Sequence, residues 1–261
     1  AGGIYISTDY GQTWGGSLPA YSVVTINVSL PGTILVGTTP SPSPPLNTFG
    51  GIFASTDTGR TWKGLGLSNH VITALAAGSA GTLYALADGG AYKRVDSSGA
   101  WQFISPPNRQ FTAIALTGGG SVLLSSEAEG TFRSTNNGVT WTGSDIRGRD
   151  VFAIATRPSG EAFAGTLGSG VYKSSPGAEG WTQLPLESTG EYVYSFAASG
   201  EALFTGSNRG VSRTTDGGES WLNLSTFGGS AYTVATTPDG SVFAGTGFGV
   251  FRASDTGDSW I

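Results

Sequence analysis

One phrase of twelve residues recurs seven times along the 261-residue chain and ends on tryptophan each time. The copies are GIYISTDYGQTW (3–14), GIFASTDTGRTW (51–62), GAYKRVDSSGAW (90–101), GTFRSTNNGVTW (130–141), GVYKSSPGAEGW (170–181), GVSRTTDGGESW (210–221) and GVFRASDTGDSW (249–260). Successive tryptophans are 48, 39, 40, 40, 40 and 39 residues apart. Self-similarity at a nearly fixed period is typical of a repeat architecture.

Between the copies, each interval contains two short apolar runs separated by a tight turn. The pattern is clearest in VFAIATRPSGEAFAGT (151–166) and AYTVATTPDGSVFAGT (231–246), where Pro and Gly mark the turn. Two such runs predict an inner pair of strands, and the Gly-to-Trp phrase predicts an outer pair around a polar turn. Four strands in about 40 residues, repeated, predict an all-β fold, namely a β-propeller of four-stranded antiparallel blades.

The repeats define the expected blades. Seven outer pairs but only six inner pairs can be counted, so we expect six complete repeats plus an outer half blade, in a seven-bladed propeller. An incomplete blade exposes a strand edge, and we therefore expect a partner strand beside Gly3–Thr8, from further residues, a second copy or another protein. We expect a single propeller domain over 1–261, with the outer half blade at 3–18 and full repeats at about 23–66, 71–105, 111–145, 151–185, 192–225 and 231–261.

The polar turn inside each copy has the form S-x-D-x-G-x-[ST]-W, which suggests a structural role. A short Asp side chain can accept hydrogen bonds from backbone N–H groups of its own turn, and Gly two residues later adopts a conformation closed to other residues. The Trp then anchors the hairpin, so each Trp is expected to be largely buried between neighbouring blades. Three copies drift from this form, for example with Asn136 and Pro176 in place of Asp, which argues against an essential chemical role.

This turn phrase resembles the Asp-box of the BNR-repeat β-propellers, whose members include sialidase-like, xyloglucanase-like and photosystem II assembly factor-like proteins. The resemblance covers the whole chain and implies the propeller fold. Family habit also implies an exported, periplasmic or cell-surface protein. The structural Asp-box positions are Asp9, Trp14, Asp57, Trp62, Asp96, Trp101, Asn136, Trp141, Trp181, Asp216, Trp221, Asp255 and Trp260.

Composition excludes several kinds of partner and site. Thirteen basic and eighteen acidic residues leave a formal charge of −5, which gives no basis for nucleic-acid binding, and no apolar stretch is long enough for membrane insertion. Cysteine is absent and His70 is the only histidine, so we expect His70 on the surface or capping a loop. Each Asp turn offers a single carboxylate, too few for calcium. We expect no metal and no cofactor.

By analogy with the family, ligands favour the side of the propeller formed by the connections between second and third strands and between blades. The candidate residues on that ligand face are Arg109, Glu127, Glu129, Arg147, Arg149, Asp150, Glu191, Tyr192 and Arg209.

Two further features admit alternatives. Basic residues recur at one position of the third strand, where they form a rim for an acidic partner or cover the blade with their stems; they are Lys93, Arg133, Lys173, Arg213 and Arg252. The Pro-rich segment 38–51 predicts an extended loop that covers the channel mouth or contacts a partner.

The family resemblance also raises two enzymatic alternatives. In a sialidase-like site, Arg109, Arg149 and Arg209 would clamp a carboxylate beside Tyr192 and Glu191. Adjacent strand residues point to opposite faces, however, so Glu191 and Tyr192 could cooperate only in a loop, and the Arg-Ile-Pro phrase expected before the first Asp-box is missing. In a xyloglucanase-like site, Asp150 would pair with Glu127, Glu129 or Glu191. Nothing in the sequence singles out one such pair. We therefore expect a non-catalytic interaction or scaffold propeller that binds a protein partner or glycan as part of a larger protein or assembly, with a glycoside hydrolase as the alternative.

Overall fold

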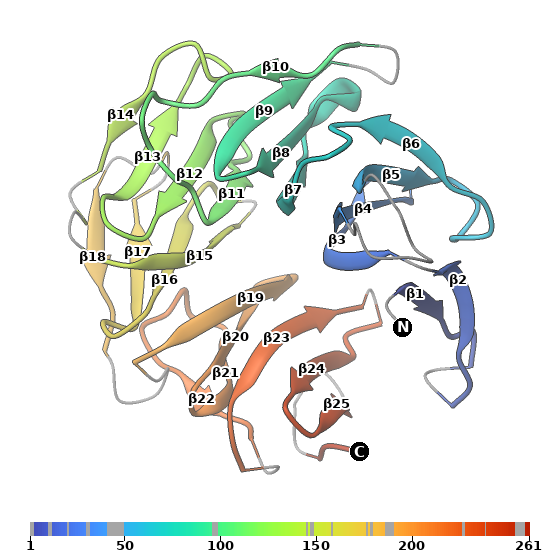
Figure 1. The fold of residues 1–261 in the computed structure, drawn as a ribbon. Coiled ribbons are helices and arrows are strands. Elements are labelled where there is room, and N and C mark those ends of the chain that lie inside the picture. The colour runs from blue at the N-terminus through green and yellow to red at the C-terminus, as the bar shows by residue number, and fades with distance from the viewer. Residues whose placement is uncertain are drawn as a thin grey trace. The chain divides into compact units, whose positions relative to one another are not determined.

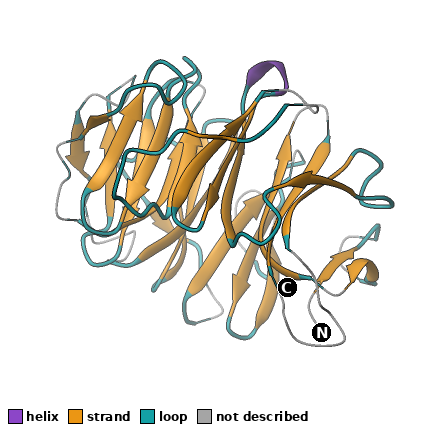
Figure 2. Cartoon of the chain, turned by 45° about the horizontal axis from the view of Figure 1, so that its top comes forward, coloured by secondary structure: helices purple, strands orange, loops and turns teal. Residues whose placement is uncertain are grey.

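The structure is a computed structural model. It describes residues 3–9, 12–19, 21–29, 32–40, 50–95, 99–144, 146, 149–157, 159–175, 177, 180–185, 191–225, 228–237, 239–253 and 259–261. In these residues the chain is all-β, and its one helical element is the short 3-10 turn η1 (Ser79–Gly81) (Figure 2). Consecutive strands pair antiparallel into sheets, which are the blades of a β-propeller (Figure 1). The predicted fold class is confirmed.

The chain forms two compact units, of which the first is Ala1–Ile114. Strands β1 and β2 form a two-stranded sheet, the predicted outer half blade, and β3–β6 and β7–β10 form two four-stranded sheets. The strands are β1 (Gly3–Ile6), β2 (Gly15–Pro19), β3 (Ser22–Ser29), β4 (Thr33–Thr39), β5 (Gly51–Ser55), β6 (Lys63–Gly66), β7 (Ile72–Ala77), β8 (Leu83–Ala87), β9 (Gly90–Arg94) and β10 (Gln102–Phe103).

The second unit, Ala115–Ile261, begins within β11. It holds three four-stranded sheets, β11–β14, β15–β18 and β19–β22, and a three-stranded sheet, β23–β25. The strands are β11 (Ala113–Leu116), β12 (Val122–Ser126), β13 (Gly130–Ser134), β14 (Thr142–Gly143), β15 (Val151–Thr156), β16 (Ala162–Thr166), β17 (Val171–Ser174), β18 (Trp181–Gln183), β19 (Val193–Ser199), β20 (Ala202–Ser207), β21 (Gly210–Thr214), β22 (Leu222–Asn223), β23 (Ala231–Thr236), β24 (Val242–Thr246) and β25 (Gly249–Ala253).

The last repeat is less regular than the sequence predicts. After β25, the described residues contribute only an isolated bridge between Ala253 and Trp260 where the other repeats have a fourth strand. The turn at 254–258, which includes Asp255, lies outside the described residues.

The hydrophobic core lies between neighbouring sheets. In the first unit, Leu35 and Ile52 pack against Ile72 and Leu75 of the next sheet. The small residues at the end of each inner pair permit this close approach. At Gly165, for example, an added Cβ would lie 2.6 Å from Cγ1 of Val193, so a side chain cannot be accommodated without movement of the next sheet.

Each well-formed repeat turn is closed by its Asp side chain. In the second copy, the Thr61 backbone N–H donates to Asp57 Oδ1 at 2.8 Å, the Thr61 hydroxyl to Oδ2 at 2.6 Å and the Ser55 hydroxyl to Oδ1 at 2.7 Å. These hydrogen bonds, the Thr61 hydroxyl foremost, lower the pKa of Asp57 to about 2, because they favour the charged carboxylate.

The same arrangement recurs in other copies. It lowers the pKa of Asp9 to about 2 and also lowers that of Asp216. Asn136 takes the same place in the fourth copy, where the Thr140 N–H donates to its Oδ1 at 2.8 Å. Asp96 and Pro176, of the third and fifth copies, lie outside the described residues.

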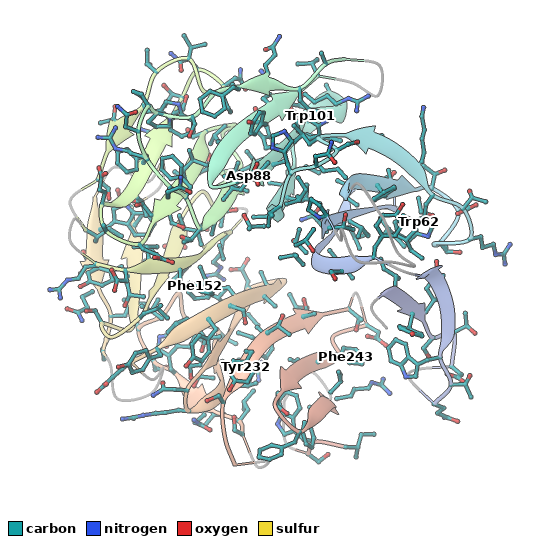
Figure 3. The ribbon with its side chains drawn as sticks, viewed as in Figure 1. Trp62, Asp88, Trp101, Phe152, Tyr232 and Phe243 are labelled. Atoms are coloured by element: carbon teal, nitrogen blue, oxygen red, sulfur yellow. The ribbon has the colours of Figure 1, made fainter. Side chains whose placement is uncertain are left out.

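The tryptophans differ in burial. Trp181 and Trp221 are buried, Trp62, Trp101, Trp141 and Trp260 are half-buried, and Trp14 is 57% exposed. The indole N–H of Trp101 (Figure 3) donates to the Leu65 carbonyl at 2.9 Å. The indole N–H of Trp260 donates to the Leu224 carbonyl at 2.8 Å, so each of these two tryptophans contacts the sheet that precedes it. In the described part of the first unit, β1–β2 is the first sheet, and its Trp14 is largely exposed. The prediction that every Trp is largely buried is wrong for Trp14.

Candidate functional site

The inner strands share an irregularity close to their first residue. The pairing register shifts between Val151 and Ala153 in β15, between Val193 and Ser195 in β19, and between Ala231 and Thr233 in β23. A β-bulge of this kind turns one side chain away from the regular alternation of the sheet. The skipped residues are Phe152, Tyr194 and Tyr232, and we call these three the aromatic row.

The aromatic row belongs to neighbouring strands of the second unit. The Val234 backbone N–H donates to the Ser195 hydroxyl at 3.0 Å, which ties β23 to β19, and β19 in turn packs on β15. The rings of Tyr194 and Tyr232 are 5.5 Å apart, centroid to centroid. Tyr232 is 57% exposed and Phe152 41% exposed (Figure 3), and Tyr194 is half-buried.

Polar residues of the predicted ligand face lie directly before the aromatic row. Asp150 precedes β15, and Glu191 and Tyr192 precede β19. Their main-chain carbonyls hold the neighbouring turns: Asp150 accepts from Leu167 N–H at 2.9 Å, and Glu191 from Gly168 and Gly170 N–H, both at 3.0 Å. The two linkers are thus fixed to one turn between β16 and β17, while the side chains of Asp150 and Glu191 remain exposed.

The same end of the second unit holds further candidates. The guanidinium of Arg149 donates to the Ser169 hydroxyl, in that same turn, at 3.2 Å. Tyr192 accepts a hydrogen bond from the Asn208 N–H at 3.0 Å, which brings the turn that contains Arg209 next to it. Arg149, Asp150, Glu191, Tyr192 and Arg209 therefore lie at the end of the second unit that carries the aromatic row. Glu191 and Tyr192 lie in the linker before β19, so the objection that adjacent strand residues point to opposite faces does not apply to them.

The remaining candidates are placed differently. Glu127 and Glu129 lie in the turn between β12 and β13. Arg109 lies in the first unit, where its guanidinium donates to the Pro107 carbonyl at 3.3 Å. Arg147 lies outside the described residues, as does most of the Pro-rich segment, 41–49.

His70 caps a loop of the first unit. Its Nδ1 lies 2.6 Å from Asp88 Oδ2, and the Val71 N–H donates to Asp88 Oδ1 at 2.8 Å. Burial would raise the pKa of the Asp88 carboxyl, but the hydrogen bonds from Val71 and His70 outweigh it, so that pKa lies below its usual range. In the described part of the chain, no group of three or more His, Asp or Glu side chains could hold a metal ion.

The basic third-strand residues cover the sheet. Lys173 pairs across the strands with Phe163, and Arg252 with Phe243. Their heads are bound within the second unit: Lys173 Nζ lies 2.8 Å from Glu161 Oε1, and Arg252 donates to the Ser241 hydroxyl at 2.9 Å. These two contacts fit stems that cover apolar side chains better than a rim for an acidic partner.

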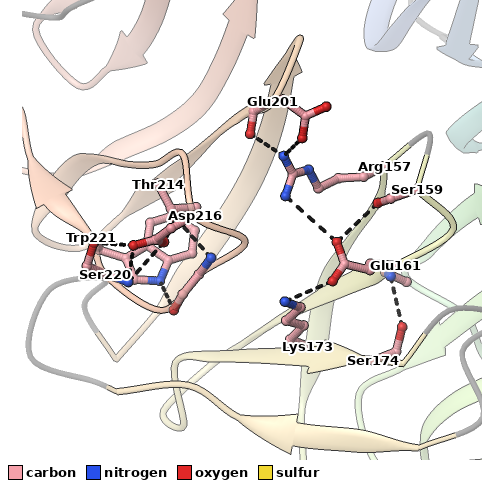
Figure 4. A network of polar contacts seen from close by, with 12 residues as sticks. Arg157, Ser159, Glu161, Lys173, Ser174, Glu201, Thr214, Asp216, Ser220 and Trp221 are labelled. Atoms are coloured by element: carbon pink, nitrogen blue, oxygen red, sulfur yellow. Dashed lines mark hydrogen bonds and ion pairs between the residues drawn. The ribbon is translucent and has the colours of Figure 1, made fainter.

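Sequence reasoning did not single out Arg157, which lies at the opposite end of β15 from the aromatic row. Its side chain is 5% exposed, and its Nη2 lies 2.6 Å from Glu201 Oε2 of the next sheet. Glu161, which contacts both Arg157 and Lys173, completes the network (Figure 4). The network ties adjacent sheets together and leaves the aromatic-row end free for other contacts.

The aromatic row was also missed, although a signal for it is present. The second residue of the inner pair is aromatic in VFAIAT, VYSFAA and AYTVAT, which the sequence analysis interpreted only as apolar strands. Alternation alone would turn this residue to one face of the sheet, and only the bulge next to it shows that it is presented outward.

No protein-family model matches the sequence, and no curated protein matches it. Solved structures match the fold. YCF48 bound to D1 peptide aligns with a TM-score of 0.69 at 19% identity, over 94% of this chain and 82% of that one. The extracellular domain of BT4673 from B. thetaiotaomicron aligns at 0.67 and 16% identity, over 98% and 33%. The GH74 enzyme of Niastella koreensis aligns at 0.53 and 19% identity, over 100% and 53%. At such identities the likeness shows the β-propeller fold alone.

The described residues contain no helix that is long and apolar enough to cross a membrane.

Proposed function

We propose that the protein is a non-catalytic interaction module of the BNR-repeat propeller family, and that the aromatic row binds an extended segment of a protein partner. The observation that carries this proposal is the row itself, in which bulges present aromatic side chains from three neighbouring strands. Tyr and other aromatic side chains supply large contact areas with few rotatable bonds, and they are enriched where binding energy is concentrated.

The surroundings of the row support a peptide ligand. Arg149, Asp150 and Glu191, in the linkers before β15 and β19, offer charges of both signs, which suit a peptide with mixed side chains. Main-chain hydrogen bonds fix both linkers to the 167–170 turn, so little ordering is needed on binding. Among the structures that share the fold, YCF48 is bound to a peptide.

A glycan is the second candidate ligand, because exposed aromatic rings also stack on sugar rings, and GH74 enzymes share the fold. Hydrolysis is the less favoured alternative. A carboxylic acid that protonates a glycosidic oxygen usually sits in an apolar or crowded site, whereas the side chains of Asp150 and Glu191 are both exposed. Export, or display at the cell surface, is part of the proposal and is supported by the family resemblance alone.

The test combines selection and turnover. The purified chain would be screened against displayed short linear peptides and against a glycan array, and assayed for hydrolysis of xyloglucan oligosaccharides and sialosides. We expect peptides to be enriched and neither substrate to be cleaved. Enrichment of glycans alone would overturn the protein-partner proposal, and turnover that Glu191→Gln or Asp150→Asn abolishes would overturn the non-catalytic one.

A matched pair of variants assigns the binding to the aromatic row. Tyr232→Ala should weaken the selected peptides by about tenfold or more. Phe103→Ala removes an equally exposed aromatic side chain from β10 of the first unit, at 61% exposure, and should leave binding unchanged. Equal losses in both variants would place the binding elsewhere.

A further inference from the structure

An apolar strip runs along β3, the innermost strand of the first four-stranded sheet. Ile26 and Val28 lie beyond the register shift between Val23 and Thr25, and they are 57% and 67% exposed. Residues that alternate along a regular strand point to one face, so these two side chains form a single surface, which we call the β3 strip. Soluble proteins seldom leave consecutive large apolar side chains on one face uncovered.

The outer part of the same face is already covered by the half blade. Ile26 pairs with Val36, and Val28 pairs with Ile34, so these partners share the face of the β3 strip. Val36 is fully buried in a cluster with Ile4 of β1 and Leu18 of β2. The covering therefore stops between β4 and β3, where a complete blade would continue with its inner pair of strands.

The chain contains its own template for that missing cover. By strand pairing, the position of Ile26 corresponds to Leu75 in β7 and Val234 in β23. Each of these residues is the second one paired after the register shift of its strand. Leu75 is 7% exposed and packs with Leu35, and Val234 is 6% exposed and packs with Phe204. Leu35 and Phe204 both belong to the inner pair of the preceding sheet. Ile26 therefore occupies the position that, in other sheets, packs against the inner pair of the preceding sheet.

The edge of β1 offers the backbone contacts that such a pair would need. In the described residues, β1 pairs with β2 alone, whereas the third strand of every four-stranded sheet pairs on both sides. Ile6 occupies the position of Arg252 in β25, which lies opposite Phe243. Where most other copies have a basic residue, this strand has an apolar one.

We propose that the first unit binds a β-hairpin by strand addition to β1. The occupant is a two-stranded segment with the alternation of this chain's own inner pairs. Its second strand pairs with Gly3–Ile6, and a large apolar residue of that strand rests on Ile26 and Ile6. The site uses residues of the first unit only and does not depend on the aromatic row of the second unit.

The probe is a synthetic peptide with the sequence of residues 231–246, AYTVATTPDGSVFAGT, labelled with a fluorophore and titrated against the full chain. Fluorescence polarisation would report binding, and hydrogen exchange would report the amides of Gly3–Ile6. We expect saturable binding and slower exchange of these amides. The same peptide carrying Phe243→Asp should bind about tenfold to a hundredfold more weakly, because it loses the buried apolar contact.

Variants of the protein locate the site. Ile26→Asp should weaken the peptide by a similar factor, and Leu222→Asp, which changes an equally exposed apolar residue of the second unit at 60% exposure, should not. If Ile26→Asp fails to fold, Val28→Thr serves the same purpose. Absence of saturable binding up to about 1 mM peptide, or equal binding of the Phe243→Asp peptide, would overturn the proposal. So would a dimer that Ile26→Asp dissociates, because a second copy would then be the occupant.

Discussion

Replacing Trp221 and Trp14 by alanine compares the same repeat position in two environments. Trp221 is 9% exposed and packs with Phe163 and Val171 of the neighbouring sheet, and its indole N–H donates to the Gly218 carbonyl at 3.2 Å. A buried aromatic side chain removes about 150–250 Å² from water, which corresponds to roughly 4–6 kcal/mol at about 25 cal/mol per Å². Since alanine keeps part of this burial, Trp221→Ala should lower the free energy of unfolding by about 3–5 kcal/mol.

Trp14 has the same place in its repeat but is 57% exposed, so less than half of that area is at stake. Trp14→Ala should therefore cost only about 1–2 kcal/mol. Urea unfolding followed by far-UV circular dichroism measures both variants without relying on indole fluorescence. A difference of less than about 1 kcal/mol between them would refute the assignment of these tryptophans to a covered and an uncovered sheet face.

Three further outcomes follow from the geometry. Asp9 and Asp57 have pKa values near 2 in the folded chain against 3.8 for the free side chain, so their contribution to stability is present above about pH 4 and is lost as the pH falls towards 2. Asp57→Asn should flatten that part of a melting-temperature series measured between pH 5 and pH 2, since Asn136 already occupies the same turn position without a charge. Gly165→Ala should cost about 1–3 kcal/mol because of the contact with Val193, whereas Gly180→Ala, with open space around it, should change the unfolding free energy by less than about 0.5 kcal/mol. Arg157→Ala should lower the free energy of unfolding more than Arg149→Ala, because Arg157 is buried between Glu161 and Glu201 while Arg149 is exposed. Chemical denaturation measures both variants, and equal losses of unfolding free energy would contradict this prediction.

The features that depend on local chemistry could be predicted from the sequence. The spacing of Ser55, Asp57, Gly59 and Trp62 specifies a turn that closes on itself, because Ser55 and Asp57 make hydrogen bonds within that stretch. The inner pairs, with their Pro-x-Gly turns, likewise carry their own strand and turn signals. The half blade was predicted because the sequence contains seven outer strand pairs but only six inner ones.

Features that depend on what lies beside a segment could not be predicted in the same way. Trp14 and Trp221 belong to nearly the same phrase, yet their burial differs, because Trp221 packs on Phe163 and Val171 of the preceding sheet whereas β1–β2 is the first sheet of its unit. The aromatic row depends on a bulge at Phe152, Tyr194 and Tyr232, and a one-residue register shift has no clear signature in an apolar run. The local sequence of Arg157 gives no sign of its ion pair, because its partner Glu201 is 44 residues further along the chain.

The central claim, that the aromatic row is the site at which a protein partner binds, is tested most directly by site-specific photo-crosslinking. A photoreactive benzoylphenylalanine would replace Tyr232 in one variant and Phe103, as the control, in another, and each would be irradiated with a peptide from the selection. We expect the peptide to be crosslinked at position 232 and not at position 103, with unlabelled peptide competing for the reaction. Crosslinking at both positions alike, or at neither while the peptide still binds, would contradict the claim.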